Sequence, residues 1–352
     1  MARSKHLRFW VSLWPHLIAL PFTAGAALGF YFSPNPIPWL APLALAWPAL
    51  LLWHGAWTLW AASQFKSSAL VGLLLLALTW PQTRGWVHVH TGPAEDGDFR
   101  VATWNVHQWR NLAWTDQAVT EERMQQAALD LHADILAIQE NRLNSGPQRS
   151  LEAWYPYSTP HEDQGLQIFS KYPIQQWNFE AFEASYPGHR GFVWADIQTP
   201  KGLVRVVNIH LVTTTFVTRE AEAETDSAGI STSVFSSAYK LTRTAKIRAQ
   251  QVDQLLAWAS TGEQPPLIWL GDFNDSPTSN TAYRLRSWKD AFEEMGKGFG
   301  STYRGLWGLP LRIDWILHDA AFQATGLQRV EQADSDHHPV WVNLAFNAPN
   351  AE

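Results

Sequence analysis

The first 94 residues of this 352-residue chain contain no Asp or Glu, since the first acidic residue is Glu95. Nine of the 21 Trp residues also lie in this segment. Its basic residues are Arg3, Lys5, Arg8, Lys66 and Arg84. A helical bundle of a soluble protein needs polar faces on its helices, and no such face is evident here. The segment is therefore predicted to lie in a membrane.

Three stretches of this segment carry no charged residue, namely residues 9–32, 37–62 and 67–83. A bilayer core requires about 20 apolar helical residues, with a range near 17–25. We expect three transmembrane helices at about 9–32, 37–62 and 67–87. The third is short, but Lys66 and Arg84 bracket it and can reach outward to the headgroups. A cleavable signal peptide is disfavoured because its apolar region spans only about 7–15 residues.

The basic residues predict the orientation of these helices. Arg3, Lys5 and Arg8 precede the first stretch, and Lys66 lies between the second and third. The positive-inside bias places these residues in the cytoplasm. Three crossings then put the rest of the chain on the extracytoplasmic, periplasmic side of a multi-pass inner-membrane protein. If the third stretch does not cross, the rest of the chain stays inside. His16 and His54 are interpreted as packing residues of the helices.

After a polar linker at 91–98, short β-rich runs alternate with helical patterns as far as residue 346, and 347–352 form a tail. Such alternation predicts one α/β domain. Strands are expected at 100–106, 135–138, 165–170, 192–197, 203–209, 267–270, 312–317 and 340–344, with helices at 121–131 and 244–258. Residues 95–352 carry 21 basic and 32 acidic residues, which disfavours non-specific nucleic-acid binding. The absence of Cys excludes disulfides, thiolate zinc sites and cysteine nucleophiles.

Polar residues that can carry chemistry follow or interrupt the apolar runs of this domain. They are Asn105, Glu140, His210, Asp272, Asn274, Asp314, Asp336 and His337. Each one alone has a simpler interpretation, such as a helix cap or a loop residue. Together, at the ends of predicted strands, they indicate a catalytic cleft.

Two motifs in this set are the most specific, Gly271-Asp272-Phe273-Asn274 and Ser335-Asp336-His337-His338-Pro339. On these motifs, residues 99–346 resemble the endonuclease/exonuclease/phosphatase superfamily, which has the DNase I-like fold. The N-terminal helices and the stretch Gly298–Tyr303 are similar to its membrane-anchored bacterial branch. The resemblance implies a four-layered α/β sandwich, in which two packed β-sheets are flanked by helices. It also implies a divalent-metal-dependent phosphoester hydrolase.

The resemblance assigns the metal ligands and the groups that act on water and phosphate. Glu140 is the first-choice ligand with Asn105 beside it, and Asp336 would hold or approach a second ion. Oxygen ligands suit Mg²⁺, with Mn²⁺ as the other choice, and argue against zinc. Asp272 would orient or deprotonate the attacking water, and Asn274 would position the phosphate.

The histidines complete the expected site. His337 would stabilise the charge that develops on the phosphate, and Asp314 would set its tautomer. His210 would be a second donor to the phosphoryl oxygens. Arg248 is a weaker candidate for substrate binding. For Arg248 and Gln250, the preferred interpretation is a solvated helix face. His338 is interpreted as structural. The cleft tyrosine of the superfamily has no match in the sequence.

The substrate is expected to depend on loops, above all the insertion at 213–244, which is either a helical lid or a solvated segment. The acidic domain and the membrane helices favour a membrane-tethered phosphodiesterase that acts on a lipid or a small phosphodiester at the outer face. A nuclease on extracytoplasmic nucleic acid and an inactive membrane scaffold are the alternatives. The expected partners are the lipid bilayer and a phosphoester substrate, and no obligate protein partner is evident.

Overall fold

The computed structural model describes residues 2–64, 66–111, 116–162, 165–186, 189–214, 234–304, 311–332 and 334–347. The chain folds into two compact units. One unit comprises residues 1–86, 214–249 and 276–284, and is called the N-terminal unit here. The other comprises residues 87–213, 250–275 and 285–352, and is called the sandwich unit. The division along the sequence that we expected, into 1–90 and 99–346, does not include the two inserts of the N-terminal unit.

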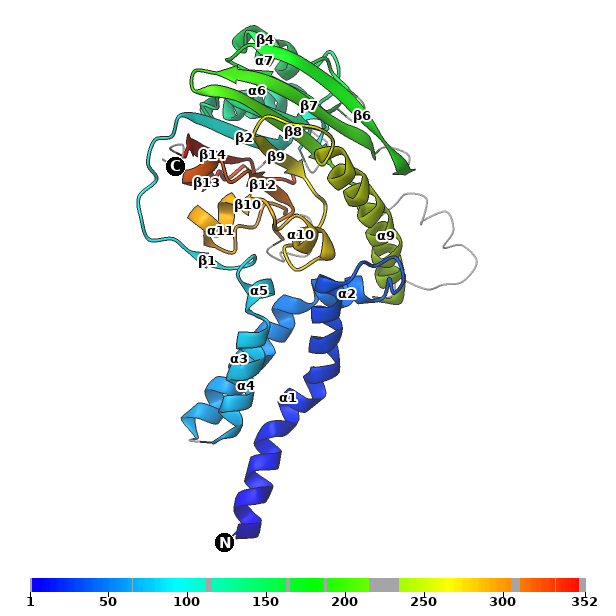
Figure 1. Ribbon diagram of the computed structural model, residues 1–352, viewed down its shortest axis with the longest axis vertical. Coiled ribbons are helices and arrows are strands. Elements are labelled where there is room, and N and C mark those ends of the chain that lie inside the picture. The colour runs from blue at the N-terminus through cyan, green and yellow to red at the C-terminus, as the bar shows by residue number, and fades with distance from the viewer. Residues whose placement is uncertain are drawn as a thin grey trace. The chain divides into compact units, whose positions relative to one another are not determined.

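Within its described residues, the sandwich unit contains two six-stranded sheets (Figure 1). The first sheet has the order β10 (Lys289–Asp290), β12 (Asp314–His318), β9 (Leu267–Asp272), β8 (Gly202–His210), β7 (His189–Thr199) and β6 (Ile174–Tyr186). The second has the order β13 (Phe322–Arg329), β14 (Val340–Phe346), β2 (Phe99–Asn105), β3 (Ile135–Gln139), β5 (Gln167–Ser170) and β4 (Tyr157–Ser158). The pairs β8–β9 and β2–β3 are parallel, and the other neighbours are antiparallel. A two-stranded sheet pairs β1 (His88–Val89) with β11 (Lys297–Gly298).

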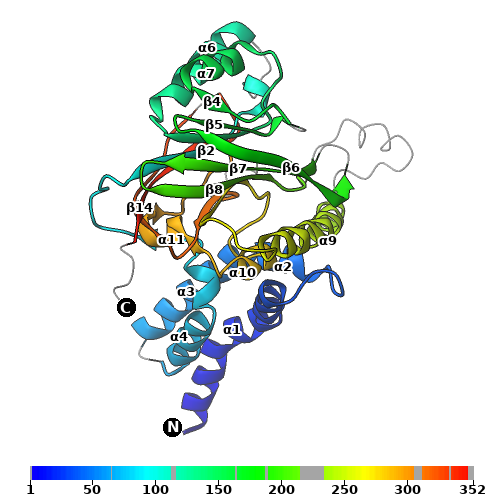
Figure 2. The same cartoon turned by 45° about the horizontal axis from the view of Figure 1, so that its top comes forward.

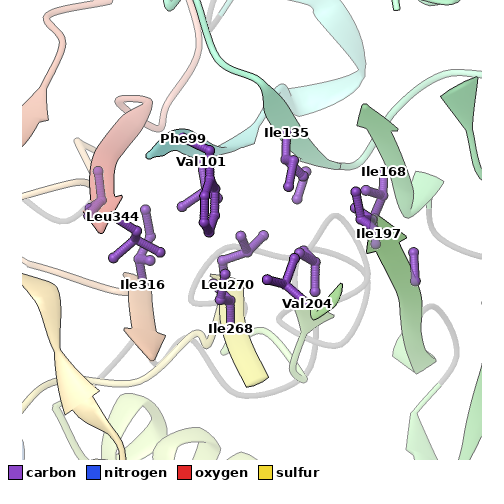
Figure 3. Close-up of a cluster of buried hydrophobic side chains, with 14 of the residues drawn as sticks. Phe99, Val101, Ile135, Ile168, Ile197, Val204, Ile268, Leu270, Ile316 and Leu344 are labelled. Carbon is purple, nitrogen blue, oxygen red and sulfur yellow. The ribbon is translucent and has the colours of Figure 1, made fainter. Parts of the chain in front are cut away.

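The two sheets pack face to face over an apolar core (Figure 3). Val101 and Ile135 of the second sheet and Val204, Ile268 and Ile316 of the first belong to this core and are buried. Successive side chains of a strand point to opposite faces, so every second residue of each strand reaches the core. This alternation explains why both faces of the central strands are apolar: one meets the other sheet, and the other meets helices.

Helices cover the outer faces of both sheets. Helices α6 (Gln117–Asp130) and α7 (Gly146–Trp154) cover the second sheet (Figure 2). Met124 and Leu151 of these helices join Trp104 in a second buried cluster. On the first sheet, residues 250–259 of helix α9 (Val234–Ala259) place Trp258 against Phe192 and Trp269. The short helices η1 (His107–Trp109) and α11 (Ala291–Met295) lie in the connections. The expectation of two packed β-sheets flanked by helices is confirmed.

The N-terminal unit contains helices α1 (Ala2–Tyr31), α2 (Leu40–Leu45), α3 (Trp47–Ser63), α4 (Ser68–Leu78), α5 (Trp80–Thr83) and α10 (Asn280–Arg284). Among the described residues, one helix is long and apolar enough to cross a membrane, with 23 residues from Phe9 to Tyr31 and a mean hydropathy of 1.4. The expectation of three such helices is wrong. Residues 37–62 divide into α2 and the 17-residue α3, and 67–87 into the 11-residue α4 and α5. Pro48 and Pro81 lie in the first turns of α3 and α5, where proline is favoured because its missing N–H would have no partner within the helix.

Helices α3 and α4 lie beside α1 (Figure 1). Trp53 Nε1 donates to the carbonyl oxygen of Pro15 at 2.8 Å. The Nδ1 atoms of His16 and His54 lie 3.0 Å apart, and their rings are stacked. Apolar side chains of these helices are exposed, among them Val11, Ile18, Leu52, Leu59, Leu70 and Leu73. An exposed apolar surface on this scale indicates contact with a membrane or a partner.

The insert at 276–284 is bound to the C-terminal ends of two N-terminal helices. Asn280 Nδ2 donates to the carbonyl oxygen of Phe30 at 2.9 Å, and Thr278 Oγ1 donates to that of Ala44 at 2.8 Å. The last carbonyl groups of a helix have no partner within the helix, so the bond from Asn280 satisfies a group of Phe30 that would otherwise be buried without one. The ring of Tyr283 packs against Phe30 edge to face.

Asn280→Ala is expected to destabilise the N-terminal unit by about 1–3 kcal/mol, because it leaves the carbonyl oxygen of Phe30 buried without a donor. Thermal unfolding of the full chain in neutral detergent checks this through the midpoint. Asn178→Ala is the matched control, because Asn178 is exposed and donates only to Glu180. Equal midpoints for the two variants would contradict the structural role of Asn280.

Candidate active site

Two parallel strand pairs place polar side chains at one end of the two sheets. In the first sheet, His210 ends β8 and pairs with Asp272, which ends β9, and Asp314 pairs with Asp272 from the other side. In the second sheet, Asn105 ends β2 beside Gln139, and Glu140 follows directly. Parallel neighbours end on the same edge of a sheet, which is why residues so far apart in sequence meet here.

Asn105 connects the two sheets through its side-chain amide. Its Nδ2 donates to Glu140 Oε1 at 3.0 Å and to Asp272 Oδ2 at 3.1 Å. Its Oδ1 accepts from the backbone nitrogen of His107 at 3.0 Å, which fixes the orientation of the amide. In this orientation Asn105 holds two carboxylates together with its nitrogen. Service as a metal ligand through Oδ1 would require the amide to rotate, and that role stays a prediction.

His337 forms a buried pair with Asp314. The distance from His337 Nδ1 to Asp314 Oδ2 is 2.8 Å, and His337 Nε2 lies 3.7 Å from Asp272 Oδ2. A carboxylate on Nδ1 fixes the tautomer that carries a proton on that atom, and leaves Nε2 directed at the site. Ser335 supports this geometry, because its Oγ accepts from the backbone nitrogen of His337 and donates to the carbonyl oxygen of Asn105.

His210 and Asn274 lie beside Asp272. His210 Nε2 is 3.6 Å from Asp272 Oδ2 and 3.8 Å from Glu140 Oε1. The backbone nitrogen of Asn274 donates to Asp272 Oδ1 at 2.9 Å, and its side-chain Nδ2 donates to the carbonyl oxygen of Leu211. The Asn274 side chain thus closes the loop after β9 onto the end of β8, and its predicted contact with phosphate stays a prediction.

Burial and neighbouring charges shift the pKa values of this cluster. Burial raises the pKa of Asp272 to about 7, although the charge of His337 lowers it. Burial lowers the pKa of His337, but the carboxylates of Asp314, Asp272 and Asp336 more than offset this and raise it well above 6.5. Burial, together with the charge of His337, lowers the pKa of His210 to about 3. At neutral pH the site therefore holds one charged and one neutral imidazole.

The donor set fits a divalent cation. Four carboxyl groups meet here, from Glu140, Asp272, Asp314 and Asp336, and His337 is the charged imidazole among them. Asp272, Asp314 and His337 each offer a ligand atom within 4.8 Å of the others. Among the described residues, no hydrogen-bond partner reaches Asp336 Oδ1, which is buried. A cluster of buried and half-buried carboxyl groups with this excess of negative charge suits a bound cation, and carboxylate oxygens are the ligands of hard divalent ions.

The remaining sequence candidates make other contacts. Arg248 belongs to the N-terminal unit, where its buried side chain donates to Thr214 Oγ1. The interpretation of a solvated helix face is therefore wrong for Arg248. Gln250, by contrast, is exposed. His338 Nδ1 accepts from the backbone nitrogen of Gln332 at 3.0 Å, a structural contact. Of the insertion at 213–244, residues 215–233 lie outside the described residues, and 234–244 are helical.

Two residues of the site were not predicted from the sequence. The ring of Tyr303 packs on His337, with centroids 5.0 Å apart, and burial with the charges of Asp336, Asp272 and Glu140 raises the pKa of Tyr303 to about 12. Thr302 Oγ1 accepts from the backbone nitrogens of Ile313 and Asp314, which fixes the start of β12. The stretch Gly298–Tyr303 was the available signal, but nothing in it indicated contact with His337.

Gly271→Ala is expected to destabilise the fold by at least about 3 kcal/mol and to abolish activity. Gly271 has a φ of 135°, and a Cβ there would overlap the carbonyl oxygen of Ile209 on the neighbouring strand. The resulting shift of the backbone would displace Asp272, which is the next residue. Gly262→Ala is the control, because Gly262 also has a positive φ but faces open space, and should cost about 1 kcal/mol. Chemical denaturation of both variants measures the difference, and equal losses would refute the steric argument.

Comparison with known proteins identifies this geometry. The Endonuclease/Exonuclease/phosphatase family matches residues 102–337. The endonuclease/exonuclease/phosphatase from Beutenbergia cavernae is similar in structure, with a TM-score of 0.50 and 20% identity over 70% of this chain and 71% of that one. The beta toxin of Staphylococcus aureus has a TM-score of 0.52 and 18% identity over 69% and 99% of the two chains. The 3′ phosphatase NExo from Neisseria, solved with a product DNA hairpin, has a TM-score of 0.50 and 18% identity over 71% and 100%.

None of the curated proteins matches the chain. The structural neighbours, all at low identity, establish the fold. The family match covers most of the chain and includes Asn105, Glu140, His210, Asp272, Asp314 and His337. The chain belongs to the Endonuclease/Exonuclease/phosphatase family, and is a hydrolase of phosphoester bonds.

Proposed function

We propose that this protein is a membrane-anchored, Mg²⁺-dependent phosphodiesterase that acts on a lipid or a small phosphodiester at the outer face of the membrane. The observation that carries the proposal is the cluster of half-buried Glu140 with buried Asp272 and His337 in a strongly acidic unit. The sandwich unit has 15 basic and 28 acidic residues. This charge repels a long polyanion far more strongly than a single phosphodiester group, which carries one negative charge.

The residues of the cluster suit an in-line attack of water on phosphorus. Asp272 receives hydrogen bonds on both of its oxygens, from Asn105 and Asn274, and is therefore held in place to accept the proton of the water. His337 donates from Nε2 to a phosphoryl oxygen, while Asp314 holds its Nδ1. Neutral His210, whose Nε2 lies 3.6 Å from Asp272 Oδ2, would donate a further hydrogen bond to the phosphoryl group.

Glu140, with Asp336 and Asp272 near it, would hold the metal ion, which neutralises charge on the phosphoryl oxygens and on the leaving oxygen when bound. Removal of divalent ions with EDTA is expected to abolish hydrolysis, and Mg²⁺ or Mn²⁺ should restore it. Bis(p-nitrophenyl) phosphate provides the measurement with the full chain in neutral detergent. Hydrolysis that persists at full rate in EDTA would overturn the metal requirement.

Anchoring rests on α1. Its apolar part of 23 residues is about 35 Å long at ~1.5 Å per residue, against a hydrocarbon core of about 30 Å. The bases Arg3, Lys5 and Arg8 precede it, so the positive-inside rule keeps the N-terminus in the cytoplasm and a single crossing carries the sandwich unit outside. An alkaline phosphatase fusion after Glu352 should be active. An inactive alkaline phosphatase fusion, with an active fusion to a cytoplasmic reporter at the same position, would refute this orientation.

One assay separates the lipid substrate from nucleic acid. The full chain with Mg²⁺ is offered a panel of phospholipids, bis(p-nitrophenyl) phosphate and supercoiled plasmid. We expect hydrolysis of the lipid or the generic diester, and little nicking. Strong nicking that disappears in Glu140→Ala would establish a nuclease instead. Inactivity on all three substrates, with the protein folded, would favour a scaffold.

A further inference from the structure

Charge is divided unevenly between the two compact units. The N-terminal unit has 11 basic and four acidic residues, against 15 and 28 in the sandwich unit. The four acidic residues are Glu220, Glu222, Glu224 and Asp226, all outside the described part of the chain. The part of the N-terminal unit that the structure describes therefore contains bases and no acids. This excess extends the acid-free character of residues 1–94 to the described parts of the two inserts, 234–249 and 276–284.

The bases of the inserts lie mainly on the first half of α9. Tyr239, Arg243 and Lys246 are exposed, and their spacing of four and three residues places them on one face of the helix. Lys240 is half-buried. The first acidic residue along α9 is Asp253, which belongs to the sandwich unit. The face is thus cationic over about two turns and carries an exposed aromatic ring.

Hydrogen bonds fix this face at one end of the apolar helices. Arg284 Nη1, on α10, donates to the carbonyl oxygen of Ala249 on α9 at 3.0 Å. The insert that contains α10 is in turn bound to the end of α1, through Asn280 and Phe30. Arg84 is exposed, and the adjacent Gly85 lies against the same insert, since a Cβ on Gly85 would lie 2.8 Å from the Cβ of Pro277.

Aromatic side chains surround this end of the helices. Tyr31 ends the apolar part of α1 and Phe32 follows it, Trp39 precedes α2, and Trp80 follows α4. They are exposed to between 40% and 60%. Amphipathic aromatic rings gather at the level of lipid headgroups, where one side is apolar and the other is wet. Bases and aromatic rings at one end of an apolar helix therefore define the level at which headgroup phosphates would lie.

We infer that Arg84, Lys240, Arg243, Lys246 and Arg284 form a binding surface for anionic phospholipid headgroups, called here the cationic surface. The inference rests on the membrane anchoring proposed above. Lysine and arginine at the membrane surface attract anionic lipids by about 1 kcal/mol each. Arg243 and Lys246 carry the attraction most directly, because both are exposed on the same face. The partner is phosphatidylglycerol or a lipid of similar charge in the bilayer that holds α1.

Binding of short-chain lipids to the full chain tests this surface. Dihexanoyl phosphatidylglycerol and dihexanoyl phosphatidylcholine are titrated separately into the protein in neutral detergent, by calorimetry. Phosphatidylglycerol should bind more tightly, and 0.5 M NaCl should weaken it. The double variant Arg243→Gln/Lys246→Gln should bind phosphatidylglycerol about 30-fold more weakly, which corresponds to ~1 kcal/mol for each charge. Phosphatidylcholine binding should not change.

Lys171→Gln/Lys201→Gln is the matched control, because both lysines are exposed and belong to the sandwich unit. This control should bind as the unaltered chain does. Equal affinity for the two lipids, insensitivity to salt, or undiminished phosphatidylglycerol binding by the first double variant would each overturn the inference. Displacement of the lipid by duplex DNA at equal charge concentration would assign the surface to nucleic acid. Release of the chain from membranes by carbonate would refute the anchoring. Absence of diester hydrolysis by the unaltered chain would refute the proposed activity. Both outcomes can be told apart from a failure of lipid binding at the cationic surface.

Discussion

Asp272→Asn is expected to lower kcat for phosphodiester hydrolysis by roughly 10²–10⁴-fold, which is the usual contribution of a positioned general base. The replacement keeps the size of the side chain but removes the proton acceptor. Burial places the pKa of Asp272 at about 7, so the wild-type group accepts a proton readily at neutral pH. Steady-state kinetics with bis(p-nitrophenyl) phosphate and saturating Mg²⁺ provide the measurement.

The replacement also puts an amide near Asn105, and this needs a control. Asn105 Nδ2 donates to Asp272 Oδ2, so an amide nitrogen at that position would face another donor. Thermal unfolding therefore accompanies the kinetics, and Glu263→Gln, at an exposed position, shows the effect of losing one surface carboxylate. A folded Asp272→Asn variant with kcat within tenfold of the wild type would remove Asp272 from the role of base.

His337→Gln and Asp314→Asn are each expected to lower kcat by about 10²–10³-fold, and the double variant by little more than either one. We expect the two side chains to act as one unit, because Asp314 Oδ2 contacts Nδ1 of His337 at 2.8 Å. A double-mutant cycle on kcat measures this coupling. His338→Gln is the matched control, because it removes an adjacent imidazole whose contacts are structural. Multiplicative losses in the double variant would show that the two residues act independently.

The same pair predicts a dependence on pH. The pKa of His337 is raised, so the contribution of this residue to stability is complete below the ordinary value of about 6.5 and is lost as the pH rises through the folded value. The charged form is also the proposed donor to phosphate, so activity should fall in the same alkaline range. This alkaline fall should be absent from the residual activity of His337→Gln.

Much of the sandwich unit is predictable from local sequence, because its central strands are short apolar runs that end in polar residues. Strand β3 was expected at 135–138 and spans Ile135–Gln139. Strands β6 and β13 were not expected. Strand β6 lies at a sheet edge and alternates apolar with polar residues irregularly, and β13 contains a register shift between Ala324 and Gly326. Edge strands and bulges depend on tertiary pairing, which weakens their signal in the sequence.

The N-terminal helices, by contrast, were predicted poorly from the sequence. The absence of charged residues from 37–62 and 67–83 predicted two further transmembrane helices. Composition, however, does not show where one helix ends and the next begins. Pro48 and Pro81 lie in the first turns of the new helices α3 and α5, and the helices of these two stretches are too short to cross a membrane. The grouping of 214–249 and 276–284 with the N-terminal helices was equally hidden, since it depends on single bonds such as Asn280 to Phe30.

The residues of the site were visible as a set because strand ends in parallel pairs are a recurrent place for function. Their orientations were not visible. The Asn105 amide is turned by the backbone nitrogen of His107, and Tyr303 reaches His337 through a bridge between distant segments. Such details arise from the packing of the two sheets, and no spacing along the chain encodes them.

The bond between Asn280 and Phe30 also imposes an order on biosynthesis. The two residues are 250 positions apart, so α1 leaves the ribosome long before the insert that caps it. At roughly 5–20 residues per second, this interval is about 10–50 s. During that time the first helix is made and ready to enter the bilayer, while the end of α1 still lacks its partner. Maturation of the N-terminal unit must therefore wait until translation has passed residue 284, long after the anchor itself has been synthesised.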